Sequence, residues 1–444
     1  MTKTGRYTRL AGMAGLAMLA MTAPAFAQEV EEEVFTLSGP ETAYIFNTLL
    51  FLIGGFLVMW MAAGFAMLEA GLVRSKNVAM QCTKNIALFS IAGIMYYLVG
   101  YNLMYDGVDG GYFGSISLWG VDDSGGVGTD ASGYASASDW FFQMVFVATA
   151  ASIVSGTLAE RIKLWPFLVF TVVLTGVIYP IQGAWQWGGG WLSEMGFSDF
   201  AGSTIVHSTG GWAALMGALI LGPRLGKYVK GGGVNPMPGS SMPLATLGTF
   251  ILWLGWFGFN GASQLALGTV DDANAVSTIF INTTIAAAAG VVAAMILTQL
   301  LYKKVDITMA LNGALAGLVA ITAEPLAPTL GWACIIGGIG GVIVVLTVPL
   351  LDKLHIDDVV GAIPVHLFAG IWGTMAVPLT NADTSFAVQA TGVISIGIFV
   401  AVSSLVLWLA LRFTIGIRCS EEEEMMGLDK AEIGVEAYPE FTTS

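Results

Sequence analysis

Two nine-residue stretches of this sequence follow one pattern, D-x-x-G-x-x-x-V-H. The first is DFAGSTIVH at 199–207, and the second is DVVGAIPVH at 358–366. They end in His207 and His366, two of only three histidines in the chain. A neutral imidazole carries one N–H donor and one acceptor nitrogen, and it can exchange protons near neutral pH. The repeat therefore predicts a pair of proton-handling side chains, each with an aspartate eight residues ahead of it.

Both histidines fall in apolar runs, where a histidine can also be a structural side chain hydrogen-bonded to a neighbouring helix. Inside a bilayer an ionisable group is costly, and one within a span is a candidate functional residue. Because the spacing is matched as well, we favour the functional interpretation for His207 and His366. Asp199 and Asp358 lie near expected helix starts and are interpreted as caps for free backbone N–H groups. The third histidine, His355, lies in a charged loop.

The composition excludes a soluble domain. Of 444 residues, 55% are hydrophobic and only 11% are charged, and the mean hydropathy is +0.75, whereas soluble domains have about 25% charged residues. We therefore expect an all-α polytopic membrane protein in a lipid bilayer. The formal net charge of −14 resides mainly in loops and tails and does not indicate a nucleic-acid partner. The three cysteines have neither a pairing pattern nor metal-ligand spacing, and we expect neither a metal nor a cofactor.

An N-terminal signal peptide is expected ahead of the membrane domain. Basic residues before a short apolar run, followed by A-F-A at 25–27, predict secretion with cleavage after residue 27; the alternative is an uncleaved extra helix. Beyond this point, apolar runs of about twenty residues or more predict eleven transmembrane helices. We place them near 43–73, 77–103, 139–159, 163–183, 200–223, 241–262, 274–302, 307–325, 330–351, 358–378 and 391–417.

Basic residues give the expected orientation of these helices. Lys and Arg occur in alternate loops, and the other loops carry Asp and Glu instead, so the positive-inside rule places the N-terminus outside and the C-terminus in the cytoplasm. The two motif copies then enter the bilayer from opposite faces, and their histidines, about 12 Å deep, should meet near its centre. Five helices per copy predict a 5+5 inverted repeat. The expected units are the signal peptide 1–27, a periplasmic segment 28–42, a first five-helix repeat 43–223, a cytoplasmic loop 224–240, a second five-helix repeat 241–378, a long final helix 391–417 and a cytoplasmic tail 418–444.

Aromatic residues gather at the expected outer mouth. Trp187 lies in QWGGGW, and Phe146 ends the run WFFQMVF. The sixth expected helix carries Phe259 and Ser263 four residues apart, on one helix face. Ring faces attract cations by about 0.5–2 kcal/mol per contact, and a serine oxygen offers a lone pair. The alternatives are an interfacial aromatic belt for the tryptophan and core or lipid-facing packing for the phenylalanines.

Together these stretches resemble the ammonium transporter family, the Amt/Mep/Rh proteins. The resemblance runs from about residue 43 into the tail and also includes GFAMLEAG, GTLAERI, GWFGFN, ALNGALAGLVAITA and GLDKAEIGVEAY. It implies a homotrimer of the bacterial Amt type in the inner membrane, with one narrow pore per subunit. It also implies a role for each site residue: an outer cation site of Phe146, Trp187 and Ser263, a gate of stacked Phe146 and Phe259, a twin-imidazole pore of His207 and His366, and Asp199 as a structural acid beneath the outer site.

The function that the resemblance implies is transport of ammonium into the cytoplasm, without enzyme chemistry. A cation recruited by the aromatic mouth cannot cross a dry lumen at low cost, so it must first lose a proton and cross as ammonia, with or without the proton. An ammonium sensor with little flux and a neutral-gas channel of the Rh type are the alternatives. An intramembrane hydrolase is disfavoured because neither histidine has a neighbouring nucleophile or HExxH spacing.

Several positions qualify this resemblance. Leu367 follows His366 where many family members have glycine, and Ile433-Gly434-Val435 stands where many carry His-Gly-Glu. A PII signalling protein is the cytoplasmic partner that the usual tail implies, and the altered tail weakens that expectation. The acidic run 421–424 is interpreted as a solvated helix end, with partner binding as the alternative. Glu69, in the first expected helix, is interpreted as a packing carboxylate for which a proton role stays open.

Overall fold

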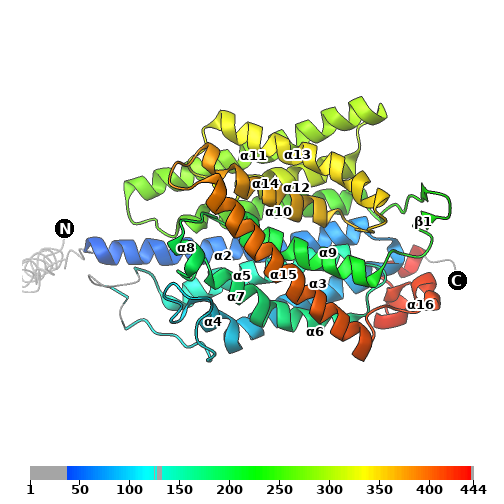
Figure 1. The fold of residues 1–444 in the computed structure, drawn as a ribbon, viewed down its shortest axis with the longest axis horizontal. Helices are drawn as coiled ribbons and strands as arrows, with labels where there is room; N and C mark the ends of the chain where they lie inside the picture. The colour runs from blue at the N-terminus through cyan, green and yellow to red at the C-terminus, as the bar shows by residue number, and fades with distance from the viewer. Residues whose placement is uncertain (1–37, 125, 128–132, 442–444) are drawn as a thin grey trace, which may run out of the picture. The chain divides into compact units, whose positions relative to one another are not determined.

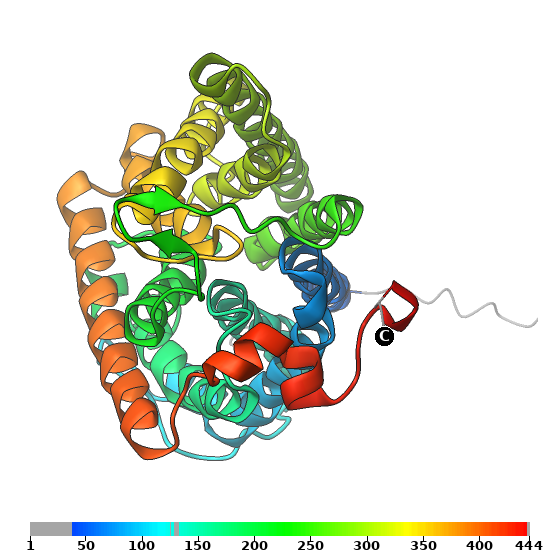
Figure 2. The same ribbon diagram turned by 90° about the vertical axis from the view of Figure 1, so that its right-hand side faces the viewer.

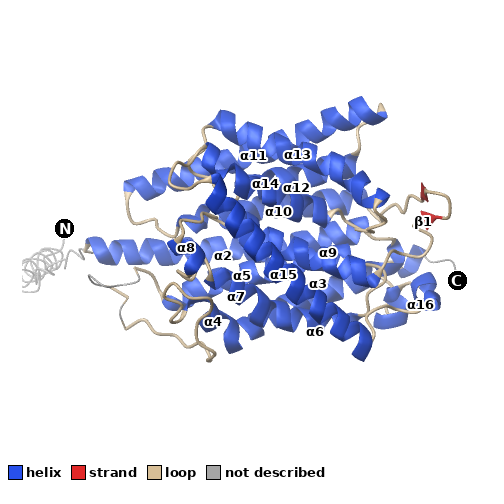
Figure 3. Ribbon diagram, in the orientation of Figure 1, coloured by secondary structure: helices blue, strands red, loops and turns tan. Residues whose placement is uncertain are grey.

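Helices are the main secondary structure in the residues that the structure describes. The computed structural model covers residues 38–124, 126–127 and 133–441, and Pro40–Ser444 forms one compact unit. The expected signal peptide 1–27 and most of the expected segment 28–42 lie outside the described residues. Figure 3 shows helices joined by loops, together with a short antiparallel hairpin of β1 (Tyr228–Val229) and β2 (Gly233–Val234).

Long apolar helical segments make up most of the compact unit. In the described part of the chain nine of them are long and apolar enough to cross a membrane, and two shorter apolar segments accompany them. Each overlaps one of the predicted apolar runs. The nine are Gly39–Leu72, Ser75–Tyr105, Ser136–Thr157, Leu164–Ala184, Ser203–Leu221, Met242–Gln264, Val270–Tyr302, Leu330–Lys353 and Phe386–Thr414, and the two shorter segments are Ile307–Ile321 and Ile363–Leu379.

Several segments contain more than one kind of helical turn. Four of them include a π-helical turn, which holds one extra residue per turn. The α-helices are α2 (Gly39–Leu72), α3 (Val78–Met95), α4 (Tyr101–Tyr105), α5 (Ser136–Thr157), α6 (Leu164–Val173), α7 (Tyr179–Ala184), α8 (Trp191–Glu194), α9 (Thr209–Leu221), α10 (Met242–Gly261), α11 (Val270–Tyr302), α12 (Ile307–Ile321), α13 (Leu330–Lys353), α14 (Ala369–Ala376), α15 (Phe386–Thr414) and α16 (Glu421–Met426). The π-helical turns of these four segments are η2 (Tyr96–Gly100), η3 (Leu174–Ile178), η4 (Ser203–Ser208) and η6 (Ile363–Phe368).

The helical segments that carry the two histidines begin later than predicted. The fifth was expected from residue 200 and starts at Ser203, and the tenth was expected from 358 and starts at Ile363. Each start follows a motif glycine with left-handed backbone, Gly202 at φ 107° and Gly361 at φ 81°, a conformation that costs glycine little. Each aspartate therefore stands in the loop ahead of its helix, and the eight residues from aspartate to histidine are not all helical, because the first turn begins after the glycine.

Glycines bring α11, α12 and α13 into close contact. A Cβ atom on Gly290 would lie 2.1 Å from the carbonyl oxygen of Gly313, and one on Gly341 would lie 2.2 Å from that of Gly290. Small residues at these crossings let helix backbones approach, which is how apolar helices gain packing energy when a hydrophobic driving force is missing. Figures 1 and 2 show the three helices gathered on one side, in green to yellow.

The long helix α15 crosses the others diagonally, in orange in Figure 1. It packs against α9 and, at Trp408, against the ring of Phe170 on α6, with centroids 3.8 Å apart and planes 6° from parallel. The Trp408 indole N–H donates to the carbonyl of Ala213 on α9. The same helix therefore ties together the segments on either side of the first histidine motif.

The C-terminal tail folds back against the loops at one end of the unit, in red in Figure 2. Asp429 accepts hydrogen bonds from the backbone N–H groups of Ala79 and Met80 at the start of α3. Burial raises the pKa of the Asp429 carboxyl, and these N–H groups partly oppose the shift. Lys76 donates to the carbonyls of Glu424 and Met425. The tail is thus held by the loop between α2 and α3.

The interpretation of the acidic run 421–424 as a solvated helix end was wrong for its last residue. Glu424 is only 2% exposed, because its carboxylate accepts from the backbone N–H of Leu225 and from Arg418. Glu423 forms a capping box with Ser420 at the start of α16. A local helix cap and a long-range contact therefore account for two of these acids.

Candidate functional site

His207 and His366 lie side by side among the packed helices. Their Nδ1 atoms are 3.1 Å apart, and their ring centroids are 5.2 Å apart. Both side chains are buried, with 0% and 3% of their surface exposed. Each belongs to a π-helical turn, η4 for His207 and η6 for His366, and such turns are frequent at functional sites because they turn side chains out of the regular helical register.

The aspartate of each motif copy positions the histidine by capping the turn that carries it. The Asp199 carboxylate accepts four backbone N–H groups, at 2.8–3.1 Å: those of Gly202, Ser203, Thr204 and Ile205. The Asp358 carboxylate accepts from the backbone N–H groups of Gly361 and Ile363 and from the hydroxyl of Thr157. The motif therefore encodes a cap, a left-handed glycine and a histidine on the first turn.

Aromatic rings follow one another from Trp187 to the histidine pair. Phe146 lies 5.9 Å from the Trp187 ring and 4.2 Å from that of Phe259, measured between centroids. Phe259 in turn lies 5.1 Å from His207. The planes of Phe146 and Phe259 are tilted by 41°, so the two rings expected to form a stacked gate contact each other at an angle. Both rings are buried.

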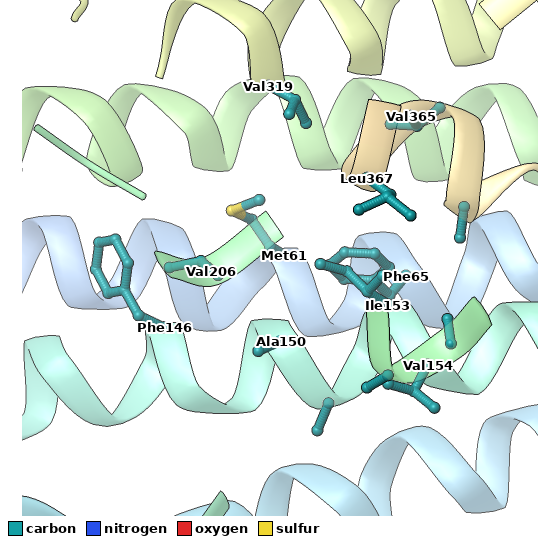
Figure 4. Close-up of a cluster of buried hydrophobic side chains, with 14 of the residues drawn as sticks. Met61, Phe65, Phe146, Ala150, Ile153, Val154, Val206, Val319, Val365 and Leu367 are labelled. Atoms are coloured by element: carbon teal, nitrogen blue, oxygen red, sulfur yellow. The ribbon is translucent and has the colours of Figure 1, made fainter. Parts of the chain in front are cut away.

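Apolar side chains surround this row of rings. Figure 4 shows Phe146, Ala150, Ile153 and Val154 following one another along α5, near Val206 of η4. Leu367, the residue after the second histidine, belongs to the same cluster and is 2% exposed. It packs against the backbone of α9, where a Cβ on Gly211 would lie 2.7 Å from its Cβ. A polar guest moving past the histidines would therefore meet few hydrogen-bonding groups other than the imidazoles.

A cavity of about 590 Å³ opens beside Trp187, and we call it the Trp187 vestibule. The expected cation-site residues Phe146, Trp187 and Ser263 all line it, as does Asp199. The Ser263 hydroxyl donates to the carbonyl of Phe259, and the Trp187 indole N–H donates to the carbonyl of Asp199. Both donors point into the protein, which leaves ring faces and the serine lone pairs for a cation with N–H groups.

Two further cavities lie on the other side of the histidines. One, of about 360 Å³, is lined by Arg224, Asp358, Asn312 and Val360 among others, and we call it the Arg224 vestibule. The other, of about 10 Å³, is lined by His366 and also by Asn312 and Val360. Because they share two lining residues, the small cavity is adjacent to the Arg224 vestibule.

A buried ion network at the Arg224 vestibule was missed by sequence reasoning. Arg224 donates to both oxygens of the Asp357 carboxylate at 2.9 Å and to Glu160 at 3.1 Å, and Glu160 also pairs with Arg74. Burial by itself would raise the pKa of the Asp357 carboxyl, but the hydrogen bonds from Arg224 and the charge of Arg161 hold it well below its usual range. From the sequence, the arginines of this network indicate only the orientation of the helices, and no pairing with Asp357 or Glu160 is predicted.

A second missed feature is the buried Lys84, which accompanies the buried Glu69; the two residues are 0% and 1% exposed. Gln81, Asn85 and Ser155 all donate to one oxygen of the Glu69 carboxylate. This agrees with the packing interpretation of Glu69. The signal that could have found Lys84 is simple: it is a lysine inside the apolar run 77–103, well away from both ends.

The third histidine, His355, is not part of this arrangement. It lies in the loop after α13 at φ 57°, and its ring contacts Tyr228, with centroids 4.7 Å apart. In the described ranges, no group of three or more His, Cys, Asp or Glu side chains could hold a metal ion.

Comparison with known proteins assigns this arrangement to a class of membrane transport proteins. Residues 49–438 match the Ammonium Transporter Family, and the chain belongs to this family. It is 45% identical to the ammonium transporter Amt2 of Archaeoglobus fulgidus over 422 residues, which cover 88% of this chain and 87% of the relative. Among solved structures it is similar to one titled "Sensor Amt Protein", with a TM-score of 0.82 and 35% identity, covering 88% of this chain and 98% of that one. It is also similar to Mep2 of Candida albicans, with a TM-score of 0.77 and 25% identity, covering 93% and 95% of the two chains.

Proposed function

We propose that this chain recruits ammonium in the Trp187 vestibule, removes one proton and conducts ammonia past His207 and His366 into the cytoplasm. The single observation that carries the proposal is the 3.1 Å contact between the two Nδ1 atoms, buried beneath the contacting Phe146 and Phe259 rings. This contact supports a path on which the transported ammonium or ammonia loses its hydration shell and contacts aromatic ring faces and imidazole edges instead.

Recruitment rests on the lining of the Trp187 vestibule. The faces of Trp187 and Phe146 attract a small cation by about 0.5–2 kcal/mol each, and Ser263 accepts one N–H hydrogen bond. Asp199 lies beneath them as a structural acid whose carboxylate is occupied by four backbone N–H groups. It adds negative charge near the cation without needing to bind it.

Deprotonation follows from the low polarity beyond the Phe146 and Phe259 gate. An unpaired ammonium ion in a low-dielectric lumen costs tens of kcal/mol by Born estimates, whereas an unsatisfied neutral polar group costs only about 2–7 kcal/mol. Burial shifts the pKa of an amine by up to about 3–5 units, which suffices for a guest that titrates somewhat below the lysine value of about 10. Potassium has no proton to lose, so the same path excludes it.

The membrane arrangement that we propose is the one inferred from the sequence. All eleven apolar segments cross the bilayer as two inverted five-helix repeats, 43–223 and 241–378, with α15 as a further span. The Trp187 vestibule then faces the periplasm, and the Arg224 vestibule and the tail face the cytoplasm of a bacterial cell. A homotrimer is the proposed assembly, and a PII protein at the tail is a proposed partner.

An ammonium sensor with little flux is the second candidate, favoured by the likeness to the structure titled "Sensor Amt Protein". A sensor needs the Trp187 vestibule but not a conducting histidine pair. Two results together would favour the sensor: ammonium quenches the fluorescence of Trp187, and uptake by the same protein is negligible. Flux through a neutral-gas channel would not depend on the cation site. The variant Trp187→Leu, which alters that site, would therefore leave the flux unchanged.

The test of the proposed function is methylammonium uptake into liposomes containing the protein. The double variant His207→Ala, His366→Ala should lose uptake, because it removes both imidazole edges from the path. The matched control is His355→Ala, which removes the histidine that lies in a loop and should leave uptake at the level of the unmodified protein. Unchanged uptake in the double variant refutes the proposal.

A further inference from the structure

Glu69 on α2 has a carboxylate oxygen that the proposed function does not use. Its Oε2 atom accepts hydrogen bonds from Gln81 at 2.5 Å, Asn85 at 3.0 Å and Ser155 at 2.8 Å. Its Oε1 atom is buried and has no hydrogen-bond partner among the described residues. An unpaired buried acceptor costs about 1–3 kcal/mol, so a structure that retains one calls for an explanation.

The small cavity beside Glu69 is also lined by His366, the second histidine of the pair. Glu69, His366, Ser152 and Asn312 all line it, and the rest of its wall is mainly apolar. Its volume of about 10 Å³ is close to the minimum that one water molecule requires. One small hydrogen-bonding molecule can therefore stand between the second imidazole and the unpartnered carboxylate oxygen.

The charges around Glu69 allow its carboxyl group to alternate between two protonation states. Lys84 on α3 is the nearest cation: its ammonium group donates to the Ser155 carbonyl at 2.9 Å, while the Ser155 hydroxyl donates to Glu69. Arg161 is a second cation that acts electrostatically on Lys84, and His366 lines the cavity from η6. The Lys84 ammonium group stabilises the Glu69 carboxylate through Ser155. Among the described residues Glu69 forms no direct ion pair, so no such partner fixes its carboxylate as permanently charged.

We propose that Glu69 accepts the proton that His366 releases and passes it to the Arg224 vestibule. The proton that ammonium loses enters the histidine pair and makes His366 an imidazolium, while the N–H electron pair stays on the ammonia nitrogen. In the first step the N–H bond at Nε2 of this imidazolium breaks and leaves its electron pair on nitrogen. A water molecule in the small cavity gains this proton and gives another to Oε1 of Glu69, which becomes a neutral carboxylic acid. In the second step that O–H bond breaks, the proton leaves through the side lined by Asn312 and Val360, and the carboxylate is restored. No oxidant or reductant takes part.

This inference rests on the proposed function and adds a charge balance to it. One ammonia and one proton cross separately, so the net movement is one ammonium ion and one positive charge. Without Glu69, ammonia still passes the imidazoles, but the proton has no acceptor on the cytoplasmic side. The substitution Glu69→Gln keeps the side-chain shape and an oxygen that accepts from Gln81, Asn85 and Ser155, and it removes only the ability to take up a proton.

The experiment measures charge and ammonia separately on the same proteoliposomes. Ammonium is added as a pulse, the current is recorded on a solid-supported membrane, and an enclosed pH dye reports ammonia that enters without a proton. We expect Glu69→Gln to reduce the current by about a hundredfold or more, in the range of lost proton-transfer groups, and to increase the alkalinisation of the lumen. Glu69→Asp, which restores a carboxyl group, should recover part of the current. Glu324→Gln is the matched control, because Glu324 is also buried but lines none of the three cavities.

The outcomes separate this inference from the proposed function. An unchanged current in Glu69→Gln overturns the proton role of Glu69. Equal loss of current and ammonia entry, in a variant that still elutes and melts like the unmodified protein, assigns Glu69 a structural role and also overturns it. Ammonia entry without current in the unmodified protein leaves the proposed function standing and removes this inference. Absence of both signals in the unmodified protein overturns the proposed function itself.

Discussion

The Nδ1 atom of His207 lies 3.1 Å from the Nδ1 atom of His366, so the same ring position is used from two motif copies 159 residues apart. Two neutral imidazoles can share this hydrogen bond only if one carries its proton on Nδ1 and the other on Nε2. One ring then presents a lone pair at Nε2 and the other presents an N–H group there. The pair is chemically asymmetric although the backbone motifs are alike. The two roles are exchanged only when the shared proton moves between the Nδ1 atoms while the former donor gains a proton at Nε2 and the former acceptor loses one there.

Removal of the Asp199 carboxylate should destabilise the fold. Asp199→Ala leaves four backbone N–H groups at the start of η4 without their acceptor. Each unsatisfied buried donor costs about 1–3 kcal/mol before relaxation. We expect a clear decrease in the melting temperature of the detergent-solubilised protein. Asp383→Ala, in an exposed loop, is the control, and equal melting temperatures for the two variants would contradict the capping role.

Loss of the Ser263 hydroxyl should weaken recruitment without blocking conduction. In Ser263→Ala the Trp187 vestibule loses one acceptor for an N–H group, worth about 1 kcal/mol. The half-saturating ammonium concentration of the current should therefore increase about fivefold, while the maximal current stays near its original value. Ser263→Thr keeps the oxygen and should behave like the unmodified protein. A decrease in maximal current at unchanged half-saturation would place Ser263 in the conduction step instead.

The network at Asp357 should make stability depend on acid pH. Because the folded pKa of Asp357 is depressed by Arg224 and Arg161, its contribution is complete above the unfolded value of about 4 and decreases as pH falls through the folded value. The melting temperature of the unmodified protein should thus fall from about pH 4 downward. Arg224→Met removes the main partner and should lower stability at neutral pH by about 3–5 kcal/mol.

The slope of stability against pH distinguishes this network from general acid unfolding. In Arg224→Met the depressed pKa is lost, so the decrease below pH 4 should be smaller than in the unmodified protein. Lys353→Met removes an exposed cation from the end of α13 and serves as the charge-matched control. Parallel pH curves for Arg224→Met and the unmodified protein would show that Asp357 is not the group responsible.

Release of the tail should make the chain at Lys430, whose side chain is already exposed, easier for trypsin to cleave. Asp429→Ala removes the acceptor for the N–H groups of Ala79 and Met80, so the tail should detach more often from the start of α3. Trypsin cleavage after Lys430 should become several-fold faster, since about 1 kcal/mol of lost contact corresponds to about fivefold in the population of the open form. The control variant is Glu422→Ala, which changes an exposed residue of the same tail. Trypsin should cleave this variant at the original rate.

The positions of the helical segments could be predicted well, because each span needs about twenty apolar residues and the chain marks them by composition. Their starts could not be predicted to the residue at Ser203 and Ile363, since the helix begins only after the aspartate cap and the left-handed glycine. The approach of His207 and His366 was expected from the opposed motif copies, and the structure brings their rings together. Their role in conduction stays a prediction.

The sequence by itself determined the class of protein, the apolar segments and the identity of the paired histidines, because hydropathy and motif spacing are properties of the linear chain. The tertiary structure alone decided which polar groups became partners: Arg224 with Asp357, Glu424 with Leu225, and Glu69 with Ser155. Residues 86 to 199 positions apart are brought together by helix packing, and burial then makes each of these hydrogen bonds costly to leave unmade. A carboxylate that looks like a loop charge or a packing residue in the sequence acquires its chemistry only from that environment.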